Sequence, residues 1–235
     1  MNLLLFTLLL FIVSLTSYSQ NFEASNSNRE PTKGNQNEGV FVDVRDNQMY
    51  KWVRIGEQVW MAENLNYETE SGSWCYDNDS TMCKHYGRLY QWEAAIEGCP
   101  AGWHLPSKEE YKQLFKYVKS NRKRSKSKVA ISLRSCRQKG SPYGSECNTN
   151  EHPYWKRHIF SRFGTDDYKF SALPGGARKF NGKFFRLRSV CYLWTSTEVW
   201  KNTAYHFYAD YSVKKFWGKH LHRKYGISVR CVKDN

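Results

Sequence analysis

The stretch CPAGWHLPSKEEY, residues 99–111, gives the clearest structural signal in the 235-residue chain. Ser107 and Glu110 form a capping box, in which the two side chains bond reciprocally to backbone amides at the start of a helix. Apolar residues follow at the i, i+3, i+4 and i+7 positions, namely Tyr111, Leu114, Phe115 and Val118. This spacing predicts an amphipathic helix that ends near Ser120.

The residues on the N-terminal side of this stretch predict a second helix and a set of hairpins. The helix is expected from about Gly87 to Glu97, where the Gly98-Cys99-Pro100 sequence stops it. Further upstream, residues 41–46, 49–55 and 58–61 alternate apolar and polar side chains, and short turn sequences separate them. This period-two pattern predicts an N-terminal β-meander.

The residues on the C-terminal side predict mostly short strands. They are expected at 168–173, 192–196, 204–211 and 227–232, with turns at Gly175-Gly176 and Gly226. Within 204–211, Tyr205 and Phe207 should share the face opposite His206 and Tyr208. Helices that come early and strands that come late, without βαβ alternation, favour an α+β domain over a doubly wound sheet.

The N-terminus predicts export. Residues 1–13 are almost entirely Leu, Phe and Ile, a run too short to span a bilayer, and Ser17 and Ser19 fit a small-x-small cleavage rule. We expect a signal peptide over residues 1–19, a polar tether over 20–39 and one domain over 40–235, with no membrane span in the mature chain. An uncleaved anchor is the alternative, because the usual charged n-region is missing.

Export determines how the seven cysteines are interpreted, since thiols outside a reducing cytosol tend to pair. None belongs to a C-x-x-C pair, so zinc-ribbon and thioredoxin-like sites lose their main support. Cys75 and Cys83 bracket a polar loop in which local closure is easy. Cys136 and Cys147 bracket a Gly/Pro/Ser loop in the same way.

Six motifs, in order, give the chain a family resemblance. They are DVRDNQMYKWVRIGEQVWMAENLNY (43–67), GRLYQWEAA (87–95), CPAGWHLPSKEEY (99–111), FSALPGGAR (170–178), WTSTE (194–198) and GISVRCVKDN (226–235). The series resembles the Fibrobacter succinogenes major paralogous domain, a family of exported bacterial proteins that are often of undefined role. The resemblance spans residues 40–235.

The later motifs are also distantly similar to C-type lectin-like folds, including the formylglycine-generating enzyme branch. The similarity implies an α+β, C-type lectin-like single domain with N-terminal β-hairpins, two main helices and a short-stranded antiparallel sheet, braced by disulfides. In the resembled fold, Cys99 and Cys231 would tie the end of the chain to its middle. Closing so long a loop contributes about 4 to 5 kcal/mol on the chain-entropy model, against about 2 to 3 kcal/mol for the short loops.

Cys191 is then the one cysteine without a predicted disulfide partner. It is interpreted as a buried small hydrophobe beside Tyr192 and Trp194, with a reactive or intermolecular thiol as the alternative. The formylglycine-generating branch binds copper through a cysteine pair near this region. Residues 194–198 contain no second cysteine here, so we do not expect that chemistry.

Metal and catalytic motifs are weak throughout the chain. His220-x-His222 and His206 have no third ligand at metal spacing, and the acidic loop 77–80 lacks the glycine and distal glutamate of an EF-hand. The calcium-binding tripeptides of sugar-binding lectins and the common hydrolase signatures are missing from the sequence. His104 is expected to bond locally. We therefore expect no cofactor or metal and do not favour an enzyme.

Positive charge is the strongest functional signal, at a net +14. Cations lie in three groups, within 119–139, 178–188 and 214–224. Such an excess attracts polyanions in a salt-sensitive way, although a solvated loop that keeps the protein soluble is the alternative. The candidate ligand-binding residues are Arg122, Lys123, Arg124, Lys126, Lys128, Arg186 and Arg188.

Aromatic residues are a second possible contact, because exposed rings stack on sugars or bases. Most are expected in the core; those of interest are Trp155, Trp200, Tyr205, Tyr208, Tyr211 and Trp217. The sequence thus favours a secreted, periplasmic or cell-surface, non-catalytic binding or adhesion module. Its partner would be anionic polysaccharide, lipopolysaccharide or extracellular nucleic acid. A thiol-dependent enzyme that uses Cys191 and a structural component of the bacterial cell envelope are the alternatives.

Overall fold

The N-terminal meander forms as the alternation predicts. A computed structural model describes residues 37–123, 128–157, 159 and 162–234, and in it β1 (Glu38–Asp43), β2 (Gln48–Ile55) and β3 (Gln58–Met61) pair antiparallel in sequence order. The expected signal peptide lies outside the described residues, as does the expected tether up to residue 36. Because β1 begins at Glu38, the last residues assigned to the tether belong to a strand.

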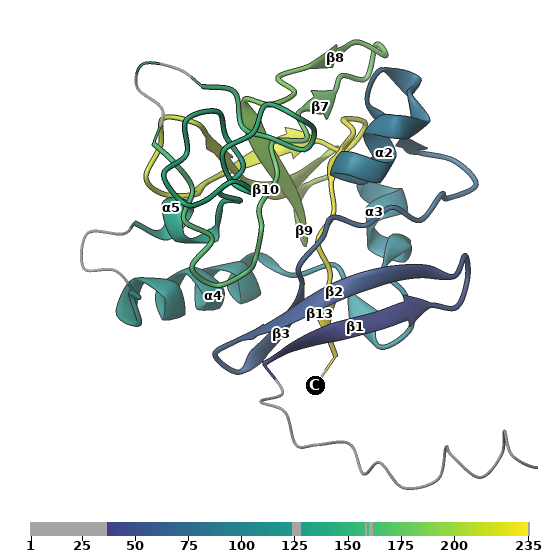
Figure 1. The fold of residues 1–235 in the computed structure, drawn as a ribbon. Helices are drawn as coiled ribbons and strands as arrows, with labels where there is room; N and C mark the ends of the chain where they lie inside the picture. The colour runs from purple at the N-terminus through teal and green to yellow at the C-terminus, as the bar shows by residue number, and fades with distance from the viewer. Residues whose placement is uncertain (1–36, 124–127, 158, 160–161, 235) are drawn as a thin grey trace, which may run out of the picture. The chain divides into compact units, whose positions relative to one another are not determined.

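The end of the chain completes this first sheet. β13 (Val232–Lys233) pairs with β3 on one side and with β6 (Trp103–His104) on the other. The sheet order is therefore β1-β2-β3-β13-β6, which places the C-terminal strand between the first hairpins and the stretch before the main helix (Figure 1).

A second sheet follows the order β11-β10-β9-β12-β5-β4. Its strands are β11 (Trp217–His222), β10 (Thr203–Asp210), β9 (Val190–Trp200), β12 (Ile227–Ser228), β5 (Leu89–Tyr90) and β4 (Ser73–Trp74). All pairs are antiparallel except β12 with β9, which is parallel. The prediction of an antiparallel sheet is therefore wrong at this one pair. A separate hairpin joins β7 (Ala177–Arg178) to β8 (Phe184–Phe185).

The capping box produces the predicted main helix, α4 (Lys108–Ser120). The Glu110 amide lies 3.2 Å from Ser107 Oγ, and the Ser107 amide lies 2.7 Å from Glu110 Oε2. Tyr111, Leu114 and Val118 are the buried residues of this helix. The apolar stripe read from the sequence is thus the face that packs into the core.

The other helices differ from the prediction. α3 spans Trp92–Gly98 and does not begin at Gly87, because Leu89 and Tyr90 pair with β12 instead. The loop between Cys75 and Cys83 holds a short 3₁₀ helix, η1 (Tyr76–Asn78), and the start of α2 (Ser80–Tyr86), whose N-cap is Asp79. A further short helix, α5, spans Val129–Leu133.

Two predicted strands are corrected. Residues 168–173 do not form a strand, since Lys169 and Ser171 have φ angles of 54° and 50°, which an extended chain cannot adopt. The stretch 227–232 is divided between β12 in one sheet and β13 in the other. The chain crosses between the two sheets at Val229–Cys231, where each residue is buried.

Residues 190–195 of strand β9 are buried apart from the half-buried Tyr192, and they separate two apolar clusters. Leu193 packs with Leu114 of α4 in one cluster, whereas its neighbour Trp194 packs with Ala95 of α3 in the other. Alternate residues of a strand point to opposite faces. β9 therefore packs against α4 on one face and against α3 on the other. Helices that pack on a largely antiparallel sheet make this an α+β domain, as the sequence predicts.

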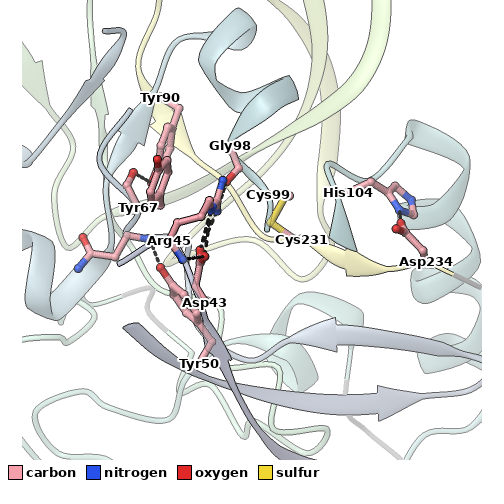
Figure 2. Close-up of a disulfide and its surroundings, with 11 residues drawn as sticks. Asp43, Arg45, Tyr50, Tyr67, Tyr90, Gly98, Cys99, His104, Cys231 and Asp234 are labelled. Carbon is pink, nitrogen blue, oxygen red and sulfur yellow. Dashed lines mark hydrogen bonds and ion pairs between the residues drawn. A yellow bond between two sulfur atoms is a disulfide. The ribbon is translucent and has the colours of Figure 1, made fainter. Parts of the chain in front are cut away.

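Three disulfides brace the unit, and they join the cysteines expected to pair. The bonds are Cys75–Cys83, Cys99–Cys231 and Cys136–Cys147. Cys99–Cys231 spans 132 residues and lies beside a polar cluster that ties the meander to α3 (Figure 2). In this cluster Arg45 donates to the Gly98 carbonyl at 2.8 Å and pairs with Asp43.

Among the helices that the structure describes, none has the length and apolarity to cross a membrane.

Candidate functional site: a basic aromatic face

Three aromatic residues form a row across the outer strands of the second sheet. Tyr208 of β10 lies directly opposite Tyr192 of β9 and opposite Trp217 of β11. Residues directly opposite in antiparallel strands project to the same face. The Tyr192 and Tyr208 rings are stacked with centroids 6.0 Å apart, and Trp217 is 43% exposed.

Two lysines lie over this row. The Lys215 Nζ atom is 3.6 Å from the centroid of the Trp217 ring, and the Lys219 Nζ atom is 5.8 Å from that of Tyr208. Both lysines are exposed. An ammonium group near the face of an aromatic ring is attracted by the ring quadrupole, so the rings hold these cations at the surface.

The β7–β8 hairpin extends the surface from the other side. Phe185 lies 6.3 Å from Tyr192, centroid to centroid, and the Lys179 Nζ atom is 5.4 Å from the Phe185 ring centroid. Burial raises the pKa of Tyr192, and the nearby Arg186 guanidinium opposes that shift. We call this surface the basic aromatic face; its residues are Lys179, Phe185, Arg186, Tyr192, Tyr208, Lys215, Trp217 and Lys219.

Two titratable groups lie next to this face, a carboxylate and an imidazole. Asp210 Oδ1 accepts the Ser212 amide at 2.8 Å and the Val213 amide at 3.1 Å. Both donors are neutral, so the carboxylate offsets part of the positive charge of the face. His206 is 4% exposed and packs against Tyr208. Burial lowers the pKa of His206 to about 4, so this imidazole is neutral at pH 7 and adds no charge.

The candidate cations read from the sequence are not all gathered here. Arg186 belongs to the basic aromatic face, but Arg188 is half-buried and stacks on Tyr154 at 5.3 Å. Arg122 and Lys123 follow the end of α4 and Lys128 precedes α5; all three are exposed. Arg124 and Lys126 lie outside the described residues.

The two groups of candidate cations are separated in space. Figure 1 draws β8 and α4 on opposite sides of the unit, so the structure does not bring Arg122 and Arg186 into one patch. The cations that do converge with Arg186 are Lys215 and Lys219. The sequence shows these lysines as a separate basic group, and only the β9–β10–β11 register places them beside the hairpin.

The aromatic residues divide between core and surface. Trp155 is 1% exposed and Tyr205 packs against the core, whereas Trp200 and Trp217 are 64% and 43% exposed. As predicted, Tyr205 contacts Phe207 on one side of β10 and His206 contacts Tyr208 on the other.

Cys191 lies in the core. Its side chain has 0% exposure, and burial raises the pKa of the thiol to about 12. A nucleophilic cysteine needs access and a substantial thiolate fraction near neutral pH. The position of Cys191 therefore gives no support to the thiol-enzyme alternative.

No group of three or more histidine, cysteine, aspartate or glutamate side chains that could hold a metal ion occurs within residues 37–123, 128–157, 159 and 162–234. In the acidic loop 77–80, Asp79 Oδ1 accepts the Thr81 amide at 2.8 Å and caps α2.

The two sheets, the short helices and the three disulfides define a disulfide-braced α+β domain. The chain belongs to the Fibrobacter succinogenes major domain family, whose model matches residues 53–233. The match begins within β2 and ends in β13, and it therefore includes the basic aromatic face. No curated protein and no solved structure matches the chain.

Proposed function

We propose that this chain is an exported, non-catalytic binding module with a C-type lectin-like fold. In this proposal the basic aromatic face binds an anionic polysaccharide or another polyanion of the cell surface or the environment. The leader-like N-terminus and the three disulfides support export, because structural disulfides are typical of oxidising compartments. The order of the GWHLPS, Gly-Gly and Trp-x-Ser motifs supports the lectin-like topology.

The observation that carries the proposal is that cations and aromatic rings occur together on one sheet. Lys215 lies over Trp217 and Lys219 over Tyr208, next to Arg186 of the hairpin. Ring faces provide apolar area for sugar rings or bases, and the cations attract carboxylate, sulfate or phosphate groups. Each exposed charge pair is weak, but a polymer engages several at once.

Retention of the oxidised protein on immobilised dextran sulfate and polygalacturonate, with uncharged dextran as the blank, tests this proposal. Wild type should bind both anionic matrices and elute with salt, because screening weakens interactions between exposed charges. The Lys215→Glu/Lys219→Glu variant should elute at clearly lower salt.

The matched control is Arg122→Glu/Lys123→Glu, which makes the same change in net charge after α4. Its elution should shift much less, because these cations lie outside the basic aromatic face. Equal shifts in the two variants would show that net charge alone sets retention and would refute a defined site.

A further inference from the structure

Two strongly exposed aromatic side chains lie at turns beside the second sheet. Phe180 belongs to the turn between β7 and β8, and Trp200 is the last residue of β9, directly before the turn to β10. Each is 64% exposed, more than any other aromatic side chain that the structure describes. Neither belongs to the basic aromatic face. Exposed apolar groups among charged neighbours are typical of surfaces that contact a protein or a membrane.

Both rings lie against the same edge strand. The Phe180 ring is 6.3 Å from the His222 ring, and the Trp200 ring is 4.9 Å from the His220 ring, centroid to centroid. His220 and His222 are two residues apart on β11 and so point to the same face of this strand. His222 is also directly opposite Thr203, the first residue of β10. The two turns therefore meet at the C-terminal end of β11.

The β7–β8 turn is closed by its own backbone. The Lys179 amide donates to the Lys183 carbonyl at 2.8 Å, and the Gly182 amide donates to the Lys179 carbonyl at 2.9 Å. Gly182 has a φ angle of 86°, a conformation that favours glycine and allows the tight reversal. Because the turn is already closed, Phe180 has little backbone freedom to lose when a partner covers it.

Four exposed lysines accompany the two rings. Two lie in the β7–β8 turn, one directly follows Trp200, and one lies just after β11; they are Lys179, Lys183, Lys201 and Lys224. None of the four has an ion-pair partner among the described residues. Acidic residues are scarce in these segments, since residues 168–197 contain none and residues 199–233 contain only Asp210. Asp210 lies at the other end of β10 from the β9–β10 turn.

The carboxylates at this end of the sheet are outnumbered by the cations. Arg223 pairs with Glu198, and its Nη1 atom lies 3.9 Å from Glu93 Oε1. Two carboxylates and one guanidinium leave a single negative charge, against the four positive charges of the lysines. The surface around the two exposed rings is therefore positive on balance, and it attracts an anionic partner.

We propose that this end of the sheet docks on the surface of an anionic lipid bilayer. Phe180 and Trp200 enter the interfacial region, where aromatic side chains are favoured, and the lysines contact the phosphate headgroups. A soluble polyanion would pair with the lysines but would offer no hydrocarbon to the rings. An apolar protein surface would cover the rings but would leave the ammonium groups unpaired. This contact is separate from the proposed polyanion site, with which it shares only Lys179.

Co-sedimentation of the oxidised protein with lipid vesicles tests this proposal. Wild type should bind phosphatidylcholine vesicles that contain about 30% phosphatidylglycerol, and it should bind vesicles of phosphatidylcholine alone far more weakly. Phe180→Ser/Trp200→Ser should lower the partition coefficient about tenfold, because the apolar contact is lost. Val44→Ser/Met49→Ser is the matched control, since it removes two exposed apolar side chains elsewhere, and it should bind as wild type does.

Two charge variants complete the experiment, and near-UV circular dichroism checks that each variant is folded. Lys183→Glu/Lys201→Glu should weaken vesicle binding about tenfold. Lys215→Glu/Lys219→Glu makes the same change in net charge on the basic aromatic face and should weaken it much less. Failure of the wild type to bind the anionic vesicles would overturn the proposal. Unchanged binding of Phe180→Ser/Trp200→Ser, or equal losses in the two charge variants, would overturn it as well.

Discussion

Arg230 is a buried guanidinium with four hydrogen bonds, to Asn64 (twice), Phe170 and Ser171. Replacing it by Met keeps much of the volume but leaves buried acceptors without donors, and each such acceptor costs about 1 to 3 kcal/mol. We expect Arg230→Met to lower the free energy of unfolding by about 3 kcal/mol or more, as measured by urea denaturation. Arg54→Met, at an exposed position on β2, is the control and should change it little.

His104 makes stability depend on pH. Burial lowers its pKa, but hydrogen bonds to Asp234 at 2.5 Å and Glu110 at 2.8 Å outweigh burial and raise it (Figure 2 shows the Asp234 contact). A raised histidine pKa stabilises the fold below the unfolded pKa of about 6.5, and this contribution disappears as pH rises through the folded value.

His104→Gln should therefore destabilise the protein more at pH 5.5 than at pH 8.5. The difference should be at most about 1 kcal/mol, because the ring is partly exposed to solvent. Urea denaturation of both proteins at the two pH values measures it. A loss that is equal at both values, or larger at pH 8.5, would contradict the assigned charge state.

The sequence predicts a local hydrogen bond for His104, and the bond to Glu110 is local. The partner Asp234 is 130 residues away, and no nearby pattern indicates it. Arg230 shows the same limit, since its acceptors come from Asn64 and residues 170–171. Local chemistry can be read from the sequence, whereas long-range polar contacts depend on how the strands are ordered.

Among the elements, those with a complete local signal are predicted best. α4 has its cap and its apolar period within one stretch, and the meander has alternation and turns. β5 is mistaken for a helix because Leu89 and Tyr90 obtain their strand partners from β12. Residues 168–173 look like a strand, but their backbone is fixed by Arg230 and Asp166.

The α4 capping box can be tested separately from the rest of the helix. Ser107→Ala removes the acceptor for the Glu110 amide and should lower the free energy of unfolding by about 1 kcal/mol. Ser107→Thr retains a hydroxyl that accepts from the Glu110 amide and donates to Glu110 Oε2, and it should recover most of the loss. Chemical denaturation monitored by circular dichroism measures both, and equal losses would contradict the capping role.

For the whole molecule, the long disulfide should matter most. On the chain-entropy model, Cys99–Cys231 contributes about 5 kcal/mol and Cys75–Cys83 about 2.5 kcal/mol, because their loops span 132 and 8 residues. Cys99→Ala/Cys231→Ala should therefore reduce the free energy of unfolding more than Cys75→Ala/Cys83→Ala does. Urea denaturation compares the two double variants, and the reverse order would contradict this ranking.

The basic aromatic face could be predicted only in part. The excess of cations is visible in the sequence, and so is the alternation that places Tyr208 opposite the core face of its strand. The pairing of β11 with β10 depends on the order of the strands in the sheet. The position of Tyr192 of β9 beside the β7–β8 hairpin depends on it as well. For this reason Arg122 and Lys123 look equivalent to Lys215 and Lys219 in sequence but not in space.

Lysine acetylation with and without dextran sulfate, read by mass spectrometry, tests most directly where a polyanion binds. We expect the polymer to protect Lys179, Lys215 and Lys219, whereas Lys123 and Lys128 should be acetylated at nearly unchanged rates. Protection of Lys123 and Lys128 with Lys215 and Lys219 still fully labelled would contradict the proposed binding face.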